Sequence, residues 1–346
     1  MKRFLSLLLA AIALLASSAL ASELPYPADT VLSVCGLTPA QSALRDALYT
    51  PVFCHQERIE LPDKTTAEDV SAAMHSLMTD YPELFHLGKT YTFGYYRDEP
   101  EYITWVEPAY RMSAGEAADL RAVLSAQAYL LADAHPDPEA LHDQLCALVT
   151  YGGDTDIRHT APGALLDGQA TCEGYAQALT LLYRMAGIPC GIISGTAVDA
   201  SGIPSAHSWN IADIDGLCLI DATWNDQDAL GLNTHWYYGL STGYMANDHT
   251  PDPELRVPLC SGEANWHDRH GYIVSSAKNA DKAIRLLVAG ETINLRMDDM
   301  MYAALTDDFP TWLEHYNERN PDAPFYGAYS MTCSDAQRCV IIQRVE

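Results

Sequence analysis

Three reactive side chains stand in order in the middle of this 346-residue sequence. Cys172 comes first, His207 follows it, and Asp221 follows His207. A thiol, an imidazole and a carboxylate are the groups that thiol acyl transfer requires, because the imidazole accepts the thiol proton and the carboxylate orients the imidazole. The sequence therefore predicts a Cys172–His207–Asp221 catalytic triad.

Cys172 is predicted to lie in the first turn of a helix. Apolar residues recur at helical spacing over 175–186, and Gly187 ends the pattern as is typical of a helix C-terminus. The unpaired N–H groups and the positive dipole of a helix start favour a thiolate and could also hold an oxyanion. The alternative is a buried cysteine that serves as a small hydrophobic residue. Gly168 and Gly174 favour the first interpretation, because they would let another chain approach.

His207 and Asp221 are expected on consecutive antiparallel strands. Because side chains alternate between the faces of a strand, the length of the connecting loop decides whether the two residues share a face. A two-residue turn at Asp215-Gly216 would place them on opposite faces. An odd-length loop, such as three residues ending in Gly216, places them on one face as direct or diagonal neighbours. The catalytic interpretation thus predicts the odd-length loop.

Further residues beside the triad are candidates for substrate binding or for stabilising an oxyanion. The two tryptophans are also expected as core or cleft wall, where one could shield the imidazole from water, and the asparagine could brace the strand pair. The set is Gln169, Glu173, Trp209, Asn210 and Trp224. No histidine cluster has the spacing of a metal site, and no Gly-rich phosphate loop is present, so we expect neither a metal nor a cofactor.

The rest of the chain predicts an α+β protein. Residues 22–62 show little periodicity and are expected to be mostly loop. The elements expected before the triad are a helix from Thr66 that Pro82 ends, a hairpin of strands 91–96 and 102–106, and helices 113–134 and 137–149. Those expected from there on are strands 190–195, 207–213 and 217–223, then a helix 277–287, a strand 292–296, a helix 300–316 and a hairpin over 328–345.

The chain is strongly acidic and begins with a segment typical of exported proteins. It has 46 acidic against 20 basic residues, a net charge of −26, so nucleic acid is a poor partner. Lys2, Arg3, an apolar run and Ala19-Leu20-Ala21 predict a signal peptide over residues 1–21, cleaved near Ala21. The apolar run is too short to span a bilayer comfortably. We therefore expect export to the cell surface, the periplasm or the medium, without stable membrane insertion.

Nine cysteines are present, and in an exported protein several are expected to be oxidised in pairs. Setting Cys172 aside leaves an even number. Cys333 with Cys339 could close a hairpin, and Cys35 with Cys54 an N-terminal loop. The pairings are hypotheses, because spacing alone does not fix connectivity.

Five blocks of sequence surround the triad in order. They are Gly163-Ala164-Leu165, Cys172-Glu173-Gly174-Tyr175-Ala176, Gly187-Ile188-Pro189-Cys190, His207-Ser208-Trp209-Asn210 and Asp221-Ala222-Thr223-Trp224. These blocks resemble the transglutaminase-like superfamily, in its exported bacterial branch. The resemblance is strong over 137–226 and weaker over 80–85 and 244–249. It departs from the family pattern at Ser208, where alanine is common, and at Asn225-Asp226, where two acidic residues are usual.

The resemblance implies a papain-like core, in which a cysteine-bearing helix packs on an antiparallel sheet that supplies histidine and aspartate. Cys172 would be the nucleophile, His207 the base and Asp221 its orienting partner. Around this core we expect a helical and hairpin N-terminal region and a small α/β C-terminal region. The expected divisions are 1–21, 22–135, 136–275 and 276–346.

The expected function is cysteine-dependent acyl transfer on amide bonds of a peptide or protein through a thioester. Hydrolysis is favoured over cross-linking, because nothing in the sequence indicates a site that excludes water or binds an amine. Two alternatives stay open: a protein-glutamine transglutaminase, and a non-catalytic module that binds peptide or cell-wall material. Oligomeric state and substrate identity do not follow from the sequence.

Overall fold

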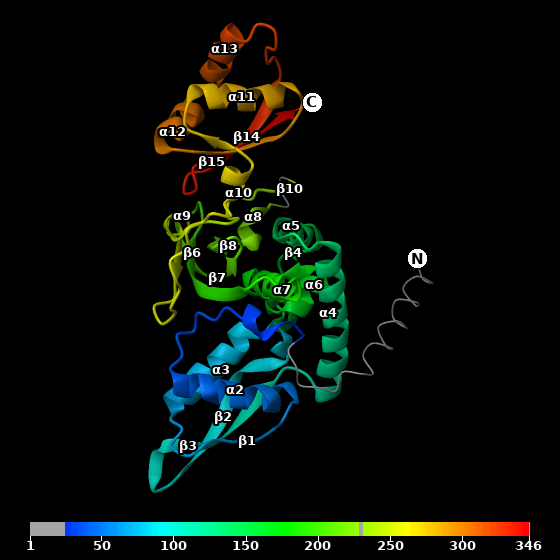
Figure 1. The fold of residues 1–346 in the computed structure, drawn as a ribbon, viewed down its shortest axis with the longest axis vertical. Helices are drawn as coiled ribbons and strands as arrows, with labels where there is room; N and C mark the ends of the chain where they lie inside the picture. The colour runs from blue at the N-terminus through cyan, green and yellow to red at the C-terminus, as the bar shows by residue number, and fades with distance from the viewer. Residues whose placement is uncertain (1–24, 228–230, 346) are drawn as a thin grey trace, which may run out of the picture.

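The computed structural model describes residues 25–227 and 231–345. The predicted signal peptide and its cleavage site lie outside these residues. Within them, helices and sheets alternate in three units that follow one another along the long axis of the molecule (Figure 1). No helix of the described part is long and apolar enough to cross a membrane. The fold is α+β, as predicted.

The N-terminal unit packs two helices against a three-stranded antiparallel sheet of order β1-β3-β2 (Figure 1). Leu48 and Val52 from one helix meet Met74 and Leu77 from the other over Val106 of the sheet. The elements are η1 (Ala28–Thr30), α2 (Pro39–Phe53), β1 (Ile59–Glu60), α3 (Ala67–Asp80), η2 (Pro82–Leu84), β2 (Leu87–Tyr96) and β3 (Glu99–Tyr110).

Helix α2 corrects the expectation that residues 22–62 are mostly loop. Its start carries a capping box, in which the Thr38 hydroxyl receives the Gln41 N–H and the Gln41 side chain receives the Thr38 N–H. Pro39 then occupies the first turn. Its apolar face is narrow, and Pro51 lies inside it, so the periodicity is weak although the N-terminal signal is present.

The central unit is a four-stranded antiparallel sheet of order β11-β6-β7-β8 with helix α7 against one face. The other face carries Ile193 and Trp209 and packs against Trp236, Tyr237 and neighbouring loops. The regular elements are α4 (Ala114–Ala134), α5 (Pro138–Leu148), β4 (Thr150–Tyr151), η3 (Asp156–His159), α6 (Ala161–Leu165), β5 (Gln169–Ala170), α7 (Cys172–Met185), β6 (Cys190–Val198), β7 (Pro204–Asp213), β8 (Leu217–Ile220), α8 (Ala222–Asn225), β9 (Asp226–Gln227), β10 (Leu232–Asn233), α9 (Thr242–Met245), β11 (His249–Pro251) and α10 (Trp266–Arg269).

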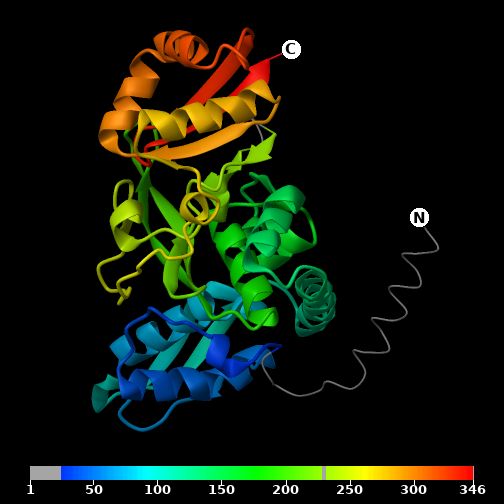
Figure 2. The ribbon, with the colours of Figure 1, turned by 45° about the horizontal axis from the view of Figure 1, so that its top comes forward.

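The C-terminal unit is a second four-stranded sheet, of order β12-β13-β15-β14, with helices packed on it (Figure 2). The predicted helix 300–316 is two helices, because Asp308 leaves helical geometry, caps the second helix through the Thr311 N–H, and is followed by Pro310 in its first turn. The elements are β12 (Ile273–Val274), α11 (Ala277–Val288), β13 (Ile293–Met297), α12 (Asp299–Asp307), α13 (Phe309–Arg319), β14 (Ala328–Ser334) and β15 (Cys339–Val345).

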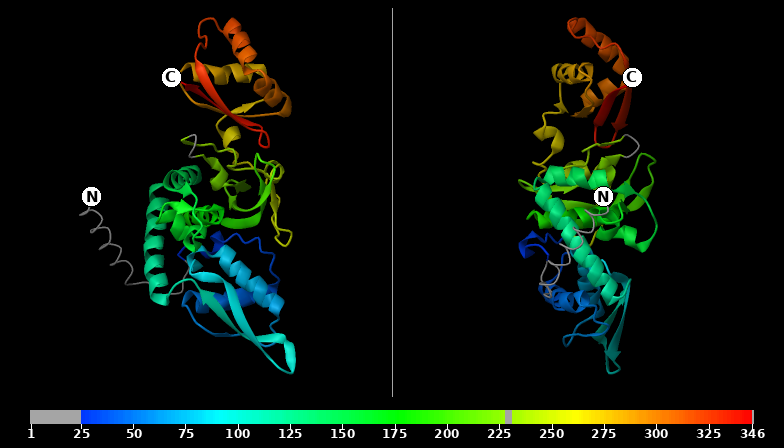
Figure 3. Two further views of the ribbon diagram at one scale, coloured as in Figure 1. Left: turned by 180° about the vertical axis from the view of Figure 1, so that it is seen from behind. Right: turned by 90° about the vertical axis from the view of Figure 1, so that its right-hand side faces the viewer.

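The central and C-terminal units share one apolar cluster. Cys339 and Ile341 of β15 pack in the same cluster as Trp209 and Ile193 of the central sheet. The views in Figure 3 place the C-terminal sheet next to the central unit and on the side away from the N-terminal unit.

The predicted disulfides are wrong, because all nine cysteines are free. In the β14–β15 hairpin Cys333 pairs with Val340 and Cys339 with Ser334, so the two thiols leave opposite faces. Cys35 lies beside Asp80, whereas Cys54 lies beside Tyr110. Neither pair has the close approach that a disulfide requires.

Candidate active site

Cys172 is the first residue of α7, as predicted, and its side chain is half-buried. Thr171 occupies the N-cap position but makes no side-chain cap; its hydroxyl donates to the Arg158 carbonyl at 3.3 Å instead. The first N–H groups of a helix have no partner within the helix, and here the cap residue leaves them free for another acceptor. The start of α7 thus presents a thiol beside hydrogen-bond donors.

Gly174 serves α7 in a way that the sequence did not predict. A Cβ atom at this position would lie 2.4 Å from the Arg158 carbonyl oxygen and 2.8 Å from the Ala170 Cβ. The chain that approaches Gly174 is therefore the η3 segment of this protein. The Gly168 backbone has φ +69°, which glycine adopts at least cost, so Gly168 is a turn residue. Neither glycine opens the site to a substrate.

We expect Gly174→Ala to destabilise the fold by about 1–3 kcal/mol, because the added methyl group has no space against the η3 backbone. Gly115→Ala is the matched control: Gly115 also lies in the first turn of a helix, α4, but nothing lies within 4 Å of its Cβ position. That variant should gain about 0.5–1 kcal/mol. Urea unfolding of both variants measures the difference, and equal effects would contradict the packing of α7 on η3.

His207 and Asp221 lie on one face of the sheet, as the odd-length loop predicted. Asp213 pairs with Leu217, so three residues, the last of them Gly216, connect β7 to β8. In this register Asp221 follows the end of β8 diagonally from His207. It differs from the expected strand residue in capping the short helix α8, where its Oδ1 receives the Trp224 N–H at 3.1 Å.

The imidazole of His207 lies between a carboxylate and a thiol. His207 Nε2 is 2.7 Å from Asp221 Oδ2, and the Cys172 thiol lies near enough to the same imidazole to favour its charged form. Because Nε2 faces the carboxylate, Nδ1 is the nitrogen available to the thiol. The His207 and Asp221 residues are 7% and 1% exposed, so water does not screen this pair.

Mutual electrostatics stabilise the charged forms of this pair. Burial alone would lower the pKa of His207, but the charge and hydrogen bond of Asp221, together with the Cys172 thiol, raise it to about 10. Burial alone would raise the pKa of Asp221, but His207 and His249 hold it well below its usual range. At neutral pH the site therefore holds an imidazolium beside a carboxylate.

This raised pKa predicts how stability depends on pH. The contribution of His207 is fully present below its unfolded pKa of about 6.5 and is lost as the pH rises through about 10. We expect the free energy of unfolding to fall over this window in the wild type and less in His207→Gln. Urea unfolding at pH 6, 8 and 10 measures both slopes, and parallel slopes would contradict the assignment.

The other predicted site residues occupy different places. Trp209 is buried, with its ring 6.2 Å from that of His207, and so forms a wall of the site. Trp224 is half-exposed, and its ring lies 5.2 Å from His207. Gln169 is exposed in β5, close to Cys172 in the sequence. Only Trp224 and Gln169 among these three present surface to a substrate.

Asn210, also in the predicted set, is buried away from the surface that Trp224 and Gln169 present. Its Nδ2 donates to the Ala176 carbonyl and to the Thr180 hydroxyl, both at 2.9 Å, and the residue is 1% exposed. Because Ala176 and Thr180 belong to α7, Asn210 faces away from His207 and fastens β7 to the cysteine-bearing helix. The sequence prediction that it braces a strand was the closer one.

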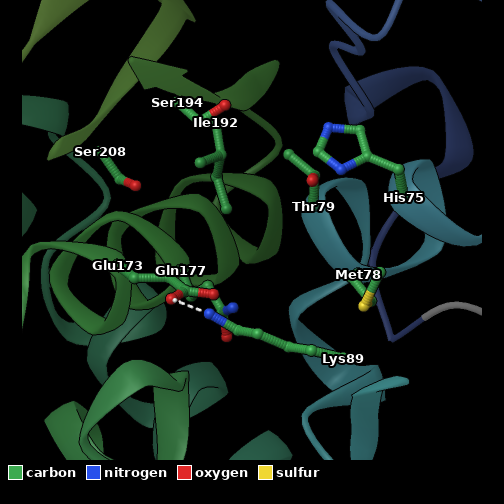
Figure 4. A pocket seen from close by; sticks show the side chains of 9 residues that line it. All are labelled: His75, Met78, Thr79, Lys89, Glu173, Gln177, Ile192, Ser194 and Ser208. Carbon is green, nitrogen blue, oxygen red and sulfur yellow. Dashed lines mark hydrogen bonds and ion pairs between the residues drawn. The ribbon is translucent and has the colours of Figure 1, made fainter. Parts of the chain in front are cut away.

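Glu173 lines a cavity of about 270 Å³ between the N-terminal unit and the central unit. Figure 4 shows Lys89 of β2 reaching across to Glu173, with Ser208 and Ile192 of the sheet on one side and His75 of α3 on the other. The Lys89 Nζ–Glu173 Oε2 distance is 3.1 Å, and the Lys89 side chain is 65% exposed. The cavity thus has a mixed lining, which includes Met78 and Ile192 as well as the ion pair, and it reaches the residue that follows Cys172.

Several residues near the site were missed by sequence reasoning. His249 begins β11 and lies 3.2 Å from Asp221, while Asp248 beside it receives the Tyr237 hydroxyl at 2.8 Å. Burial raises the pKa of Tyr151, and the nearby charges of Cys172 and Asp221 raise it further. The block 244–249 was quoted only as a weak resemblance, and no spacing rule connects it to Asp221.

The solved structures that this chain resembles are remote, and none carries an argument here. They include a candidate cysteine protease from Cytophaga hutchinsonii (19% identity, TM-score 0.26, covering 32% of this chain and 40% of that chain). They also include the periplasmic domain of TgpA from Pseudomonas aeruginosa (19%, 0.23, 36% and 55%) and a TGase (10%, 0.27, 48% and 50%). The matches thus span 40–55% of the length of these structures. No curated protein matches the chain.

The family comparison is specific to the part of the chain that carries the site. Residues 130–225 match the core model of the transglutaminase-like superfamily. This range contains Cys172, His207 and Asp221, the helix α7 and the three strands β6, β7 and β8. The central unit of the chain thus carries a core domain of the transglutaminase-like superfamily.

Proposed function

We propose that this protein is an exported cysteine-dependent enzyme that hydrolyses amide bonds of a peptide or protein. One observation carries the proposal: the buried His207 imidazole is held by Asp221 at 2.7 Å and lies near the Cys172 thiol at the start of α7. A binding module has no need of a thiol, an imidazole and a carboxylate joined in this order.

The geometry supports a two-step reaction. The Cys172 thiolate attacks the amide carbonyl carbon, and the first N–H groups of α7 receive the oxyanion that forms. His207 gives the proton on Nδ1 to the leaving nitrogen as the C–N bond breaks, which leaves a thioester. His207 then takes a proton from water, the hydroxide oxygen attacks the thioester, and the proton returns to sulfur as the acid leaves.

Capture by water is favoured because solvent reaches the site: Cys172 is only half-buried, and the Glu173 side chain next to it is partly exposed. The cavity lined by Glu173 also holds the Lys89–Glu173 ion pair, and its Lys89 side chain is 65% exposed. An amine acceptor would need a dry or complementary channel to compete with water at its much higher concentration. Hydrolysis is therefore the proposed outcome, and transfer to an amine is the outcome that the test below separates from it.

The same cavity is the proposed place for a side chain of the substrate. It lies between α3 and the start of α7, and Glu173, which lines it, follows the nucleophile Cys172 in the chain. Gln169 and Trp224 are proposed to border the bound chain on the exposed side of Cys172. A peptide that enters here would touch the N-terminal and central units together.

Alkylation by iodoacetamide tests the proposed thiol activation. Wild-type protein and His207→Ala are treated from pH 4 to 9, and mass spectrometry locates the adduct. We expect rapid modification of Cys172 well below pH 8 that slows or shifts in the variant, while the buried cysteines stay unmodified. An ordinary thiol profile that His207→Ala leaves unchanged would overturn the enzyme proposal in favour of a binding protein.

Product analysis then distinguishes the two fates of the thioester. Labelled casein is incubated with the enzyme, with and without a dansylated primary amine. We expect new peptide ends or released ammonia without incorporation of the amine. Stoichiometric incorporation of the amine would show a cross-linking transferase instead.

A further inference from the structure

A second histidine lies directly behind the proposed triad. His249 Nε2 is 3.2 Å from Asp221 Oδ2, the oxygen that His207 also contacts, and His249 Nδ1 is 2.6 Å from Asp248 Oδ1. The His249 side chain is completely buried. We propose that His249 is a buried imidazolium that shares Asp221 with His207 and thereby positions and tunes the triad. This inference rests on the proposed function for its catalytic meaning.

The hydrogen bonds around the two carboxylates require both nitrogens of His249 to donate. Asp221 receives the Trp224 N–H on its other oxygen, and Asp248 receives the Tyr237 hydroxyl at 2.8 Å on Oδ2. A carboxyl group that accepts hydrogen bonds on both oxygens is held as the anion. Because a neutral imidazole has a single N–H, an imidazole that donates to two carboxylates carries a positive charge.

The remaining surroundings of His249 also favour a cation. Its ring is enclosed by Trp224 at 4.6 Å, Trp209 at 5.0 Å and Tyr237 at 5.5 Å between centroids. Aromatic rings stabilise a cation in their neighbourhood. Burial opposes the charge, but hydrogen bonds and charges of Asp221 and Asp248 raise the pKa of His249. The hydrogen bonds and charges of the two carboxylates thus act together against burial.

Charge balance gives the second cation a task. The titratable groups that face His249 are Asp221, Asp248, His207 and Tyr237. His207 is needed as the counterion of the Cys172 thiolate, and two buried carboxylates with no further cation would be costly. With His249 protonated, Asp221 divides its charge between two imidazoles. His207 then releases its proton to a leaving group more readily than it would beside an unshared carboxylate.

The C-terminal unit fixes this arrangement. Gln337, buried in the turn between β14 and β15, donates from Nε2 to both Asp248 oxygens, at 3.1 and 3.3 Å. Asn247 Nδ2 donates to the Ala336 carbonyl at 2.8 Å. Asp248, which orients His249, is therefore held from the opposite side by a hairpin outside the catalytic core.

The pH profile of Cys172 alkylation tests the role of His249. His249→Gln removes one positive charge whose ring centroid is 5.4 Å from that of His207, so the rise of the alkylation rate with thiolate formation should move to higher pH by about one unit. His267→Gln is the matched control: His267 is equally buried but bonds Asn294, away from the triad. It should leave the profile in place. A merely structural role of His249 would lower the rate without moving the profile along the pH axis.

Nitrogen NMR of the histidine rings in the wild-type protein tests the charge directly and needs no variant to be active. The His249 signal, assigned by its loss in His249→Gln, should show two protonated ring nitrogens at pH 7.5. In Asp248→Asn the ring should lose its proton at lower pH than in the wild type. A neutral His249 ring at pH 7.5, or a His249→Gln profile that overlays the wild type, would overturn the inference. Absent alkylation in the wild type would refute the proposed function, while the NMR result would still decide the state of His249.

Discussion

Cys172→Ser should abolish turnover, with a loss of roughly 10⁴-fold or more, because a hydroxyl at this position is a far weaker nucleophile than a thiolate. His207→Ala should lose nearly as much, since the imidazole both accepts the thiol proton and donates it to the leaving nitrogen. The two groups act as a unit, so the double variant should be no slower than the worse single variant.

Cleavage of fluorescein-labelled casein measures these losses, with near-ultraviolet circular dichroism as the check that each variant folds. Cys172 is half-buried, and serine differs from cysteine only in the atom at the end of the side chain. Cys172→Ser should therefore leave stability nearly unchanged. Cys146→Ser is a control within the same unit, because Cys146 is buried and its thiol donates to the Ala222 carbonyl. A Cys172→Ser variant that kept more than one hundredth of wild-type turnover would show that the nucleophile lies elsewhere.

Asp221→Ala should destabilise the fold by about 3–5 kcal/mol, the largest stability loss that we predict. The substitution leaves two buried imidazoles without their shared carboxylate and removes the cap of α8. Asp221→Asn keeps the size and one acceptor for the Trp224 N–H, so it should cost less stability. It should nevertheless lose about 10⁴-fold in turnover, because an amide neither orients nor charges His207 in the same way.

Urea unfolding at pH 7, followed by tryptophan fluorescence, measures the stability change. Asp199→Ala provides the comparison, since Asp199 is exposed and bonds only the nearby Ser201, and its loss should stay within about 0.5 kcal/mol. The stability that Asp221 provides also depends on pH. Folding lowers the pKa of Asp221, so its contribution to the free energy of unfolding is present above about pH 4 and is lost on acidification. An Asp221→Ala variant within 1 kcal/mol of the wild type would contradict the paired, buried carboxylate.

The geometry of the triad was accessible from the sequence because each part depends on local rules. The periodicity over 175–186 fixed the helix, so Cys172 was placed at its first residue. Strand alternation required an odd loop before Leu217, and the hairpin has three residues there. These predictions needed only turn chemistry and side-chain direction, which short segments determine.

The support of the triad was not accessible in the same way. His249 meets Asp221 only because β11 adds to the sheet beside β6, a pairing between segments far apart in the chain. Gln337 reaches Asp248 only after the C-terminal sheet has packed on the central unit. No periodicity or spacing reports such contacts, because they depend on how whole units dock.

The failures among the local predictions have physical causes as well. Asn210 was included in the site because it is close to His207 in the sequence, but three residues along a strand point to the other face. The pairing of Cys333 with Cys339 overlooked the same alternation. The helix α2 was missed because its apolar face is narrow, although Thr38 and Gln41 have the spacing of a capping box at its start.

The position of Gln337 has a consequence for when the enzyme becomes competent. Synthesis proceeds from the N-terminus, so Cys172, His207 and Asp221 are all made well before the hairpin turn that steadies Asp248. A nascent chain that has completed its central unit still lacks the last brace behind Asp221. Maturation of the thiol would then be delayed until the C-terminal sheet is in place, and a half-made chain would carry a dormant nucleophile while it is still being produced.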